Sequence, residues 1–100
     1  MDKIPLDSTV VVIVAYDIKD DKKRGQVSKL LESFGERVQY SVFECILNKK
    51  SLATLRQMLS GFTLEEGESI IIYTIRSAKY LEKWRKELKE RFKSSKIVVL

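Results

Sequence analysis

The sequence predicts an α+β fold, in which helices pack on an antiparallel sheet within a single domain. Two apolar runs, Thr9 to Tyr16 and Glu68 to Ile75, have the β-branched composition of strands. Elsewhere, apolar residues recur at intervals of three and four, as on one face of a helix. The 100 residues, 44% of them hydrophobic, are enough for one core. We therefore expect a single domain over residues 1–100, with a leader at 1–8 and a C-terminal extension at 76–100.

The first strand and the first helix are predicted between residues 9 and 35. The run from Thr9 to Tyr16 is apolar without interruption, as in a strand buried on both faces, and Asp17 stands at its C-terminal end. Asp20 or Asp21 offers a carboxylate that can cap a helix from Asp21 to Phe34. We expect Gly35, which follows, in the left-handed conformation common after a last helical turn.

Two strands and a second helix are predicted in the middle of the chain. The segment from Arg37 to Leu47 is rich in Val, Tyr, Phe and Ile, but its apolar pattern changes phase near Ser41. Two short strands joined by a tight corner or a bulge account for this change. Asn48 can cap the helix that follows, which ends near Gly61 and has an apolar face of Leu52, Leu55, Leu59 and Phe62.

The last part of the chain predicts a strand, a third helix and a short closing strand. Gly67 precedes the strand from Glu68 to Ile75, and Ser77 can cap the third helix. The closing strand is expected at Ile97 to Leu100. The apolar face of the third helix comprises Leu81, Trp84, Leu88 and Phe92.

The predicted order β-α-β-β-α-β, followed by an extra helix and strand, is that of a ferredoxin-like fold. In this topology the two crossover helices cover one face of the sheet only. The first and last predicted strands of the motif are nevertheless apolar on both sides, so the other face needs a cover. A second copy of the chain is the cover we favour, in a sheet-to-sheet homodimer, and the third helix is the alternative.

Composition narrows the chemistry that the chain can perform. It contains no histidine and one cysteine, Cys45, which excludes imidazole catalysis, an internal disulfide and a Cys/His zinc site. The longest apolar run is far shorter than the ~20 residues that span a bilayer, and no signal peptide is recognisable, so we expect a cytoplasmic protein with no membrane partner. The net charge of +5 suits a polyanionic partner such as nucleic acid.

Two sequence blocks carry a specific family resemblance. The first is Val14-Ala15-Tyr16-Asp17-Ile18-Lys19-Asp20-Asp21-Lys22-Lys23-Arg24, and the second is Arg37-Val38-Gln39-Tyr40-Ser41-Val42-Phe43-Glu44. Together, at this spacing, they resemble the Cas-two family of CRISPR adaptation proteins. The likeness covers residues 9–75 in layout and fades beyond Arg76.

The resemblance implies a symmetric homodimer in which Asp17 of each protomer holds a divalent cation, Mg²⁺ or Mn²⁺, for phosphodiester hydrolysis. A hard cation of this kind needs only one or two carboxylates, because waters and phosphate oxygens complete its shell. The alternative is that Asp17 merely ends its strand and caps the next turn. One of Asp20 and Asp21 is assigned as the helix cap rather than as a metal ligand.

The resemblance also marks basic and aromatic residues around the predicted site. Arg24 and Arg37 match basic family positions, where a guanidinium can bind phosphate through two hydrogen bonds, although each could instead be a solvated charge. Tyr16 and Phe43 match supporting positions. From the residues alone we expect a packed tyrosine with a satisfied hydroxyl, and a phenylalanine packed in the core or at a dimer interface. One further basic family position is Gln26 here, which weakens the expectation of catalysis but not of the fold.

The third predicted helix is strongly basic. Residues 76–96 contain nine Lys or Arg and three Glu. Such a run is usually a solvated face, but Lys83, Lys86 and Lys89 could instead follow a nucleic-acid backbone in a sequence-independent way. Trp84 lies on the apolar face, so a packing role is expected for it rather than base stacking.

Two functions therefore stay open from the sequence. The first is a metal-dependent endonuclease acting on RNA or DNA. The second is a non-catalytic scaffold that bridges copies of the CRISPR integrase and holds a DNA fragment, as the family resemblance implies. An RNA-recognition module is less favoured, because its central strands would expose aromatic residues, whereas these strands are aliphatic.

Overall fold

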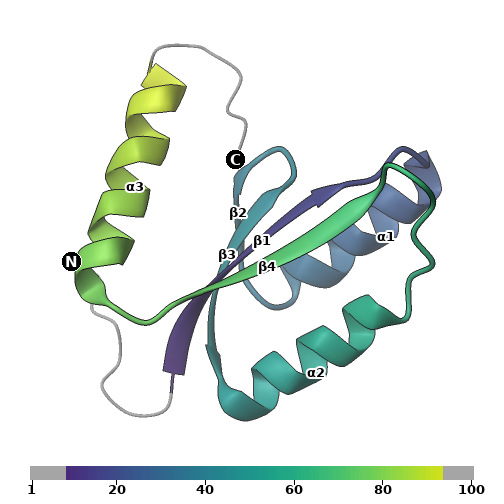
Figure 1. The fold of residues 1–100 in the computed structure, drawn as a ribbon, viewed down its shortest axis with the longest axis horizontal. Coiled ribbons are helices and arrows are strands. Elements are labelled where there is room, and N and C mark those ends of the chain that lie inside the picture. The colour runs from purple at the N-terminus through teal and green to yellow at the C-terminus, as the bar shows by residue number, and fades with distance from the viewer. Residues whose placement is uncertain (1–8, 94–100) are drawn as a thin grey trace.

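The computed structural model describes residues 9–93 and confirms the predicted order of elements (Figure 1). The predicted leader at 1–8 and the predicted strand Ile97 to Leu100 lie outside the described residues. Within residues 9–93, no helix is long and apolar enough to cross a membrane. The elements are β1 (Thr9–Asp17), α1 (Asp21–Glu32), β2 (Glu36–Gln39), β3 (Val42–Asn48), α2 (Lys49–Ser60), β4 (Ser69–Ile75) and α3 (Ala78–Lys93).

The four strands form one sheet in the order β2-β3-β1-β4, with every neighbouring pair antiparallel. This is the strand order of the predicted ferredoxin-like fold. β1 lies in the centre, and its residue Ile13 is opposite Glu44 of β3 and Tyr73 of β4. The predicted phase change near Ser41 is confirmed, because β2 ends at Gln39, β3 begins at Val42 and the register shifts between Arg37 and Gln39.

The two faces of the sheet are covered by different helices. Val12, Val14 and Tyr16 of β1 belong to the larger buried cluster, with residues of α1 and α2. Val11 and Ile13 point to the opposite face, where they pack in a second cluster with Leu81 of α3. In Figure 1, α3 accordingly lies across the sheet from α1 and α2. The third helix therefore covers the open face, the alternative to the expected second copy, at least over β1 and β3.

Part of that second face stays exposed beside α3. Ile71 and Tyr73 of β4 are 41% and 51% exposed, and Ile46 of β3 is 48% exposed. Among the described strands β4 lies at the edge of the sheet, so Ile71 and Tyr73 adjoin backbone groups that no described strand pairs. An apolar strip is thus left on the α3 face of the sheet.

The helix caps agree with the prediction at three positions. The Asp20 carboxylate accepts a hydrogen bond from the Lys23 N–H at 2.7 Å, and the Asn48 side chain accepts one from the Ser51 N–H at 2.8 Å. At α3, the Ser77 hydroxyl accepts a longer hydrogen bond, 3.5 Å, from the Tyr80 N–H. Asp20 rather than Asp21 is therefore the cap of α1.

Two expectations at the end of α1 are wrong. The helix ends at Glu32 instead of Phe34, since Ser33 is already the C-cap and its N–H bonds to the Leu30 and Leu31 carbonyls. Gly35 does not have a positive φ; among the glycines of residues 9–93, only Gly67 does, with φ of 84°. Gly35 is required for a different reason, because an added Cβ would lie 2.5 Å from Cys45 Sγ.

Candidate nucleic-acid and metal site

Asp17 is the last residue of β1 and is exposed on the α3 face of the sheet. It pairs in register with Ser69, next to the pair formed by Tyr16 and Ile70. Within residues 9–93, its carboxylate accepts no hydrogen bond and forms no ion pair. Asp17 ends β1, as the alternative had it, but its carboxylate caps neither the following turn nor α1, whose cap is Asp20; its role as a metal ligand stays a prediction.

A divalent cation fits Asp17 only in a site that other molecules complete. Among the residues that the structure describes, no three His, Cys, Asp or Glu side chains gather in a way that could hold a metal ion. A single exposed carboxylate is a suitable hard-oxygen ligand for Mg²⁺, which keeps several waters and binds phosphate oxygens. Waters, phosphate oxygens or a second protomer would have to complete the shell of a cation at Asp17, and the Asp17 pair implied by the family resemblance stays a prediction.

Cys45 is excluded as a nucleophile. It lies on β3, and its side chain is fully buried in the core between the sheet and the helices α1 and α2. Burial, reinforced by the negative charge of Glu44, raises the pKa of the thiol to about 11. The thiol is therefore protonated and inert at neutral pH.

The turn that follows Asp17 is held from both sides by charged groups. The Arg24 guanidinium donates to the Ile18 carbonyl at 2.9 Å and to the Lys19 carbonyl at 3.3 Å. The Glu68 carboxylate accepts hydrogen bonds from the Lys19 N–H at 2.8 Å and from the Asp20 N–H at 3.4 Å. The backbone between β1 and α1 is therefore fixed through both its carbonyls and its amides.

Glu68 was not predicted as a site residue, and it has the most connected carboxylate near Asp17. Its other oxygen accepts from Lys23 Nζ at 2.5 Å and from the Glu65 N–H at 2.9 Å. The Lys23 ammonium, followed by the backbone N–H donors, lowers the pKa of Glu68 to about 2. No local sequence signal marks this role, because Glu68 lies 49 residues after Lys19 and the contact depends on the pairing of β1 with β4.

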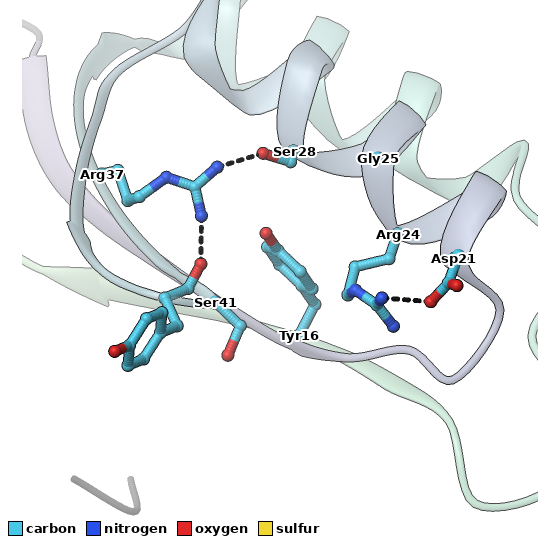
Figure 2. Close-up of a pocket in the computed structure, with 8 residues that line it drawn as sticks. Tyr16, Asp21, Arg24, Gly25, Ser28, Arg37 and Ser41 are labelled. Carbon is cyan, nitrogen blue, oxygen red and sulfur yellow. Dashed lines mark hydrogen bonds and ion pairs between the residues drawn. The ribbon is translucent and has the colours of Figure 1, made fainter. Parts of the chain in front are cut away.

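A pocket of about 430 Å³ lies between α1 and the β2–β3 hairpin (Figure 2). Arg24 and Arg37 lie on two of its sides, and Tyr16 stands between them. The Arg37 guanidinium donates to the Tyr40 carbonyl and to the Ser28 hydroxyl. The full lining comprises Tyr16, Asp21, Arg24, Gly25, Ser28, Arg37, Tyr40 and Ser41.

Phe43 supports the pocket from the core. It is fully buried, its ring centroid lies 6.4 Å from that of Tyr16, and the Arg37 guanidinium carbon lies 4.9 Å above its ring. The core role expected for Phe43 is therefore confirmed. The same ring orients Arg37 through a cation–π contact.

The structure separates the predicted site residues into two groups. Tyr16 is buried among residues that face α1 and α2, whereas Asp17, the next residue of the strand, is exposed on the other face. Arg24 and Arg37 line the pocket beside Tyr16, so they do not adjoin the Asp17 carboxylate on its own face. Strand alternation was a signal in the sequence that could have predicted this separation.

The basic helix α3 carries a third group of predicted site residues. Lys83, Lys86 and Lys89 are exposed on α3, as a contact with a nucleic-acid backbone would require. Arg85 instead turns to the sheet, where its Nε donates to Glu44 at 3.1 Å; the Trp84 indole N–H donates to the other oxygen of Glu44 at 3.0 Å. Trp84 is therefore a packing residue, as predicted, and Glu44 anchors α3.

Comparison with known proteins identifies the family. The family described as CRISPR associated protein Cas2 matches residues 10–83, from β1 into α3. This chain belongs to the Cas2 family. The match includes the Tyr16 and Asp17 strand end, the Arg24 helix and the hairpin with Arg37 and Phe43. The match ends within α3, where the sequence resemblance also fades.

Individual Cas2 relatives agree with this assignment. A Synechocystis protein named CRISPR-associated endoribonuclease Cas2 3 is 43% identical over 63% of this chain and 68% of its own length. A CRISPR-associated endoribonuclease Cas2 of Thermus thermophilus is 36% identical over 74% of this chain and 79% of its own. A crystal structure of a hypothetical protein from Thermus thermophilus superposes with a TM-score of 0.62 and 41% identity, over 69% of this chain and 84% of that one.

Proposed function

We propose that this Cas2 chain is a metal-dependent endonuclease of CRISPR adaptation that acts on RNA or DNA with Asp17 from each of two protomers. The observation that carries the proposal is the Asp17 carboxylate itself, exposed at the end of a central strand without a partner in residues 9–93. The relatives of this chain from Synechocystis and Thermus thermophilus described above are named CRISPR-associated endoribonucleases. A carboxylate so placed is free to bind a cation, which can in turn bind a phosphate oxygen.

The second copy is part of this proposal. The exposed Ile71 and Tyr73 lie on the same face of the sheet as Asp17, since Asp17, Ala15 and Ile13 pair with Ser69, Ile71 and Tyr73 in turn. Burial of this strip against a second copy would remove apolar surface from water and bring the two Asp17 residues toward one axis. Light scattering at micromolar concentration should give the mass of a dimer. The mass of a monomer would contradict the proposed homodimer.

The residues of the chain have distinct roles in the proposed reaction. Asp17 would hold Mg²⁺ or Mn²⁺, and the cation would supply activation of water and stabilisation of charge on the phosphate. Arg24 and Glu68 keep the turn after Asp17 in one conformation, so that the carboxylate needs little reorganisation when the cation binds. Lys83, Lys86 and Lys89 bind backbone phosphates away from the carboxylate.

The decisive experiment compares the unaltered protein with Asp17→Asn on single-stranded RNA, single-stranded DNA and duplex DNA, each with and without Mg²⁺. We expect Asp17→Asn to lose Mg²⁺-dependent cleavage, because asparagine has no charge to hold the cation. Folding and nucleic-acid binding should persist, since Asp17 makes no contact within residues 9–93 that stabilises the fold. The melting temperature in metal-free buffer should be equal or slightly higher, because two like charges near one axis repel.

Glu66→Gln is the matched control, because Glu66 is another exposed carboxylate of the same chain, in the loop before β4. It should retain full cleavage. Full cleavage by a contaminant-free preparation of Asp17→Asn would refute the assignment of Asp17.

A non-catalytic scaffold is the second candidate, favoured by one specific observation. Within the described part of the chain, Asp17 belongs to no group of three or more metal-ligating side chains, whereas α3 exposes four lysines, Lys79, Lys83, Lys86 and Lys89. A scaffold that holds DNA beside the CRISPR integrase needs the lysines and not the carboxylate. Absence of cleavage by the unaltered protein with every cation, together with intact duplex binding, would establish this alternative.

A further inference from the structure

Lys19 lies on the same side of the β1 end as Asp17. Tyr16 and Ile18 are 5% and 4% exposed and both belong to the buried cluster that faces α1 and α2, so the alternation of β1 continues past its last residue. The Tyr16 hydroxyl has no hydrogen-bond partner within residues 9–93, contrary to the expectation of a satisfied tyrosine, so packing alone holds this side chain. Asp17 and Lys19, which alternate with the two buried residues, are both exposed. They therefore project together on the other side of the sheet.

The backbone of Lys19 is fixed from two directions. Its N–H donates to the Glu68 carboxylate at 2.8 Å, and its carbonyl accepts from the Arg24 guanidinium at 3.3 Å. In an extended chain, residues two apart are separated by about 6.6 Å. The Lys19 side chain therefore starts from a defined position close to Asp17.

The end of the Lys19 side chain lies over Gly67, which precedes β4. A Cβ added to Gly67 would lie 2.7 Å from Lys19 Nζ and 3.4 Å from Lys19 Cε. The positive φ of Gly67 already favours glycine, and the missing side chain leaves room for the ammonium. Two residues later, Ser69 is the first residue of β4 and the register partner of Asp17. The ammonium is thus placed at the same end of the β1–β4 pair as the Asp17 carboxylate.

The Lys19 ammonium has no anionic partner within residues 9–93. The nearby Glu68 carboxylate pairs with Lys23 instead and contacts Lys19 only through the backbone N–H. The Asp17 carboxylate is likewise unpaired among these residues, so Asp17 and Lys19 do not neutralise each other. An unpaired carboxylate and an unpaired ammonium on one side of a strand end can bind the two oppositely charged parts of one ligand, a cation and a phosphate.

We propose that Lys19 is a further catalytic residue of the Asp17 site, whose ammonium donates a hydrogen bond to a non-bridging oxygen of the phosphodiester that is cleaved. This inference rests on the proposed endonuclease function and adds a phosphate-binding residue to it. Lys19 holds the phosphate beside the carboxylate and stabilises the negative charge that grows on its oxygens in the transition state. The lysines of α3 differ, because they contact phosphates away from the reacting group.

This arrangement couples the cation to the substrate. Without nucleic acid, the positive charge of Lys19 opposes a divalent cation at Asp17. Across roughly 7 Å of salt solution this repulsion weakens cation binding by about threefold. A bound phosphate lies between the two positive charges and removes the repulsion. The free protein should therefore bind the cation weakly, and the nucleic acid should bring the cation in with it.

The first test measures binding of Mn²⁺ to the protein without nucleic acid, through the electron paramagnetic resonance signal of the free ion. The site is defined as the binding that Asp17→Asn abolishes. Lys19→Met keeps the length of the side chain but removes its charge, so it should bind Mn²⁺ about threefold more tightly. Lys22→Met is the matched control, because Lys22 is an exposed lysine on α1, and it should bind Mn²⁺ like the unaltered protein.

The second test measures Mg²⁺-dependent cleavage of single-stranded RNA and DNA. Lys19→Met should lower kcat by about tenfold and leave KM within about twofold, since it loses a charged hydrogen bond that strengthens in the transition state. Lys19→Arg keeps the charge and the donors and should restore most of kcat. Lys83→Met on α3 should raise KM and leave kcat unchanged, whereas Lys22→Met should change neither.

Failure of the Lys19 role and failure of the proposed function give different results. If Asp17-dependent cleavage occurs but Lys19→Met has the kcat of Lys22→Met, the role of Lys19 is wrong and the endonuclease function stands. Tighter Mn²⁺ binding with unchanged kcat leads to the same conclusion. Equal Mn²⁺ affinity of Lys19→Met and the unaltered protein would contradict the placement of the ammonium near Asp17. If the unaltered protein cleaves nothing with any cation, the endonuclease function and the role of Lys19 are both wrong. Circular dichroism melting of each variant excludes loss of folding as the cause.

Discussion

Replacement by alanine should have opposite effects on stability at Gly35, which lies close to β3, and at Gly25, which lies in open space. In Gly35→Ala, the new Cβ would lie 2.5 Å from Cys45 Sγ, 2.5 Å from the Glu44 carbonyl oxygen and 2.8 Å from Cys45 Cα. Non-bonded heavy atoms prefer separations of about 3.5–4.0 Å, so the shortfall is roughly 1 Å. Two of the three atoms are backbone of β3, which pairs with β1 and β2 and cannot move without disturbing the sheet.

The expected cost follows from these contacts. Overpacking a core typically destabilises by about 1–3 kcal/mol, and the backbone clash places Gly35→Ala at the upper end of that range. For a domain of this size, about 3 kcal/mol corresponds to a fall in melting temperature of more than about 10 °C. Gly25→Ala adds the same methyl group in open space within a helix, so it should stabilise the protein by about 0.5–1 kcal/mol.

Urea unfolding of the three proteins at one protein concentration measures both effects. The urea midpoint should fall for Gly35→Ala and rise for Gly25→Ala. The slope of the unfolding free energy against urea concentration should stay unchanged. Equal stability of Gly35→Ala and the unaltered protein would show that the segment after α1 does not approach β3 in this way, and would refute the argument.

Two further predictions concern charged groups. The pKa of Glu68 is lowered from 4.5 to about 2 in the folded protein, so the unfolded chain binds more protons between these pH values. The stabilisation by Glu68 should be fully present above pH 4.5 and be lost as the pH falls toward 2. The difference between the urea-unfolding midpoints of the unaltered protein and Glu68→Gln should therefore shrink over that interval. A difference independent of pH would contradict the Glu68 contacts. Charge reversal of Lys83, Lys86 and Lys89 to Glu should weaken duplex binding for all sequences and reduce the slope of log K against log salt by about 0.9 for each phosphate that is no longer neutralised. The control reverses Lys49, Lys50 and Arg56, which are exposed on α2 across the sheet; equal weakening by both sets would mean that net charge alone drives binding.

The fold could be predicted because its signals are local. The apolar run of β1, the cap residues Asp20 and Asn48 and the phase change near Ser41 each depend on neighbours within a few residues. Their order then restricts the topology, since a β-α-β-β-α-β chain has few ways to pair its strands. The two sequence blocks were likewise sufficient to recognise the family that the comparison establishes.

The sequence by itself thus determined the elements, their order, the family and the strand-end position of Asp17. Only the tertiary structure decided that Gly35 avoids a clash instead of adopting a positive φ, that α3 covers the second face through Glu44, and that Glu68 holds a turn 49 residues before it. It also decided that the Tyr16 hydroxyl is left without a protein partner, among the described residues, beside two arginines. These features arise from contacts between segments distant in the chain. Such contacts depend on the distances between packed elements, which no local pattern of residues encodes.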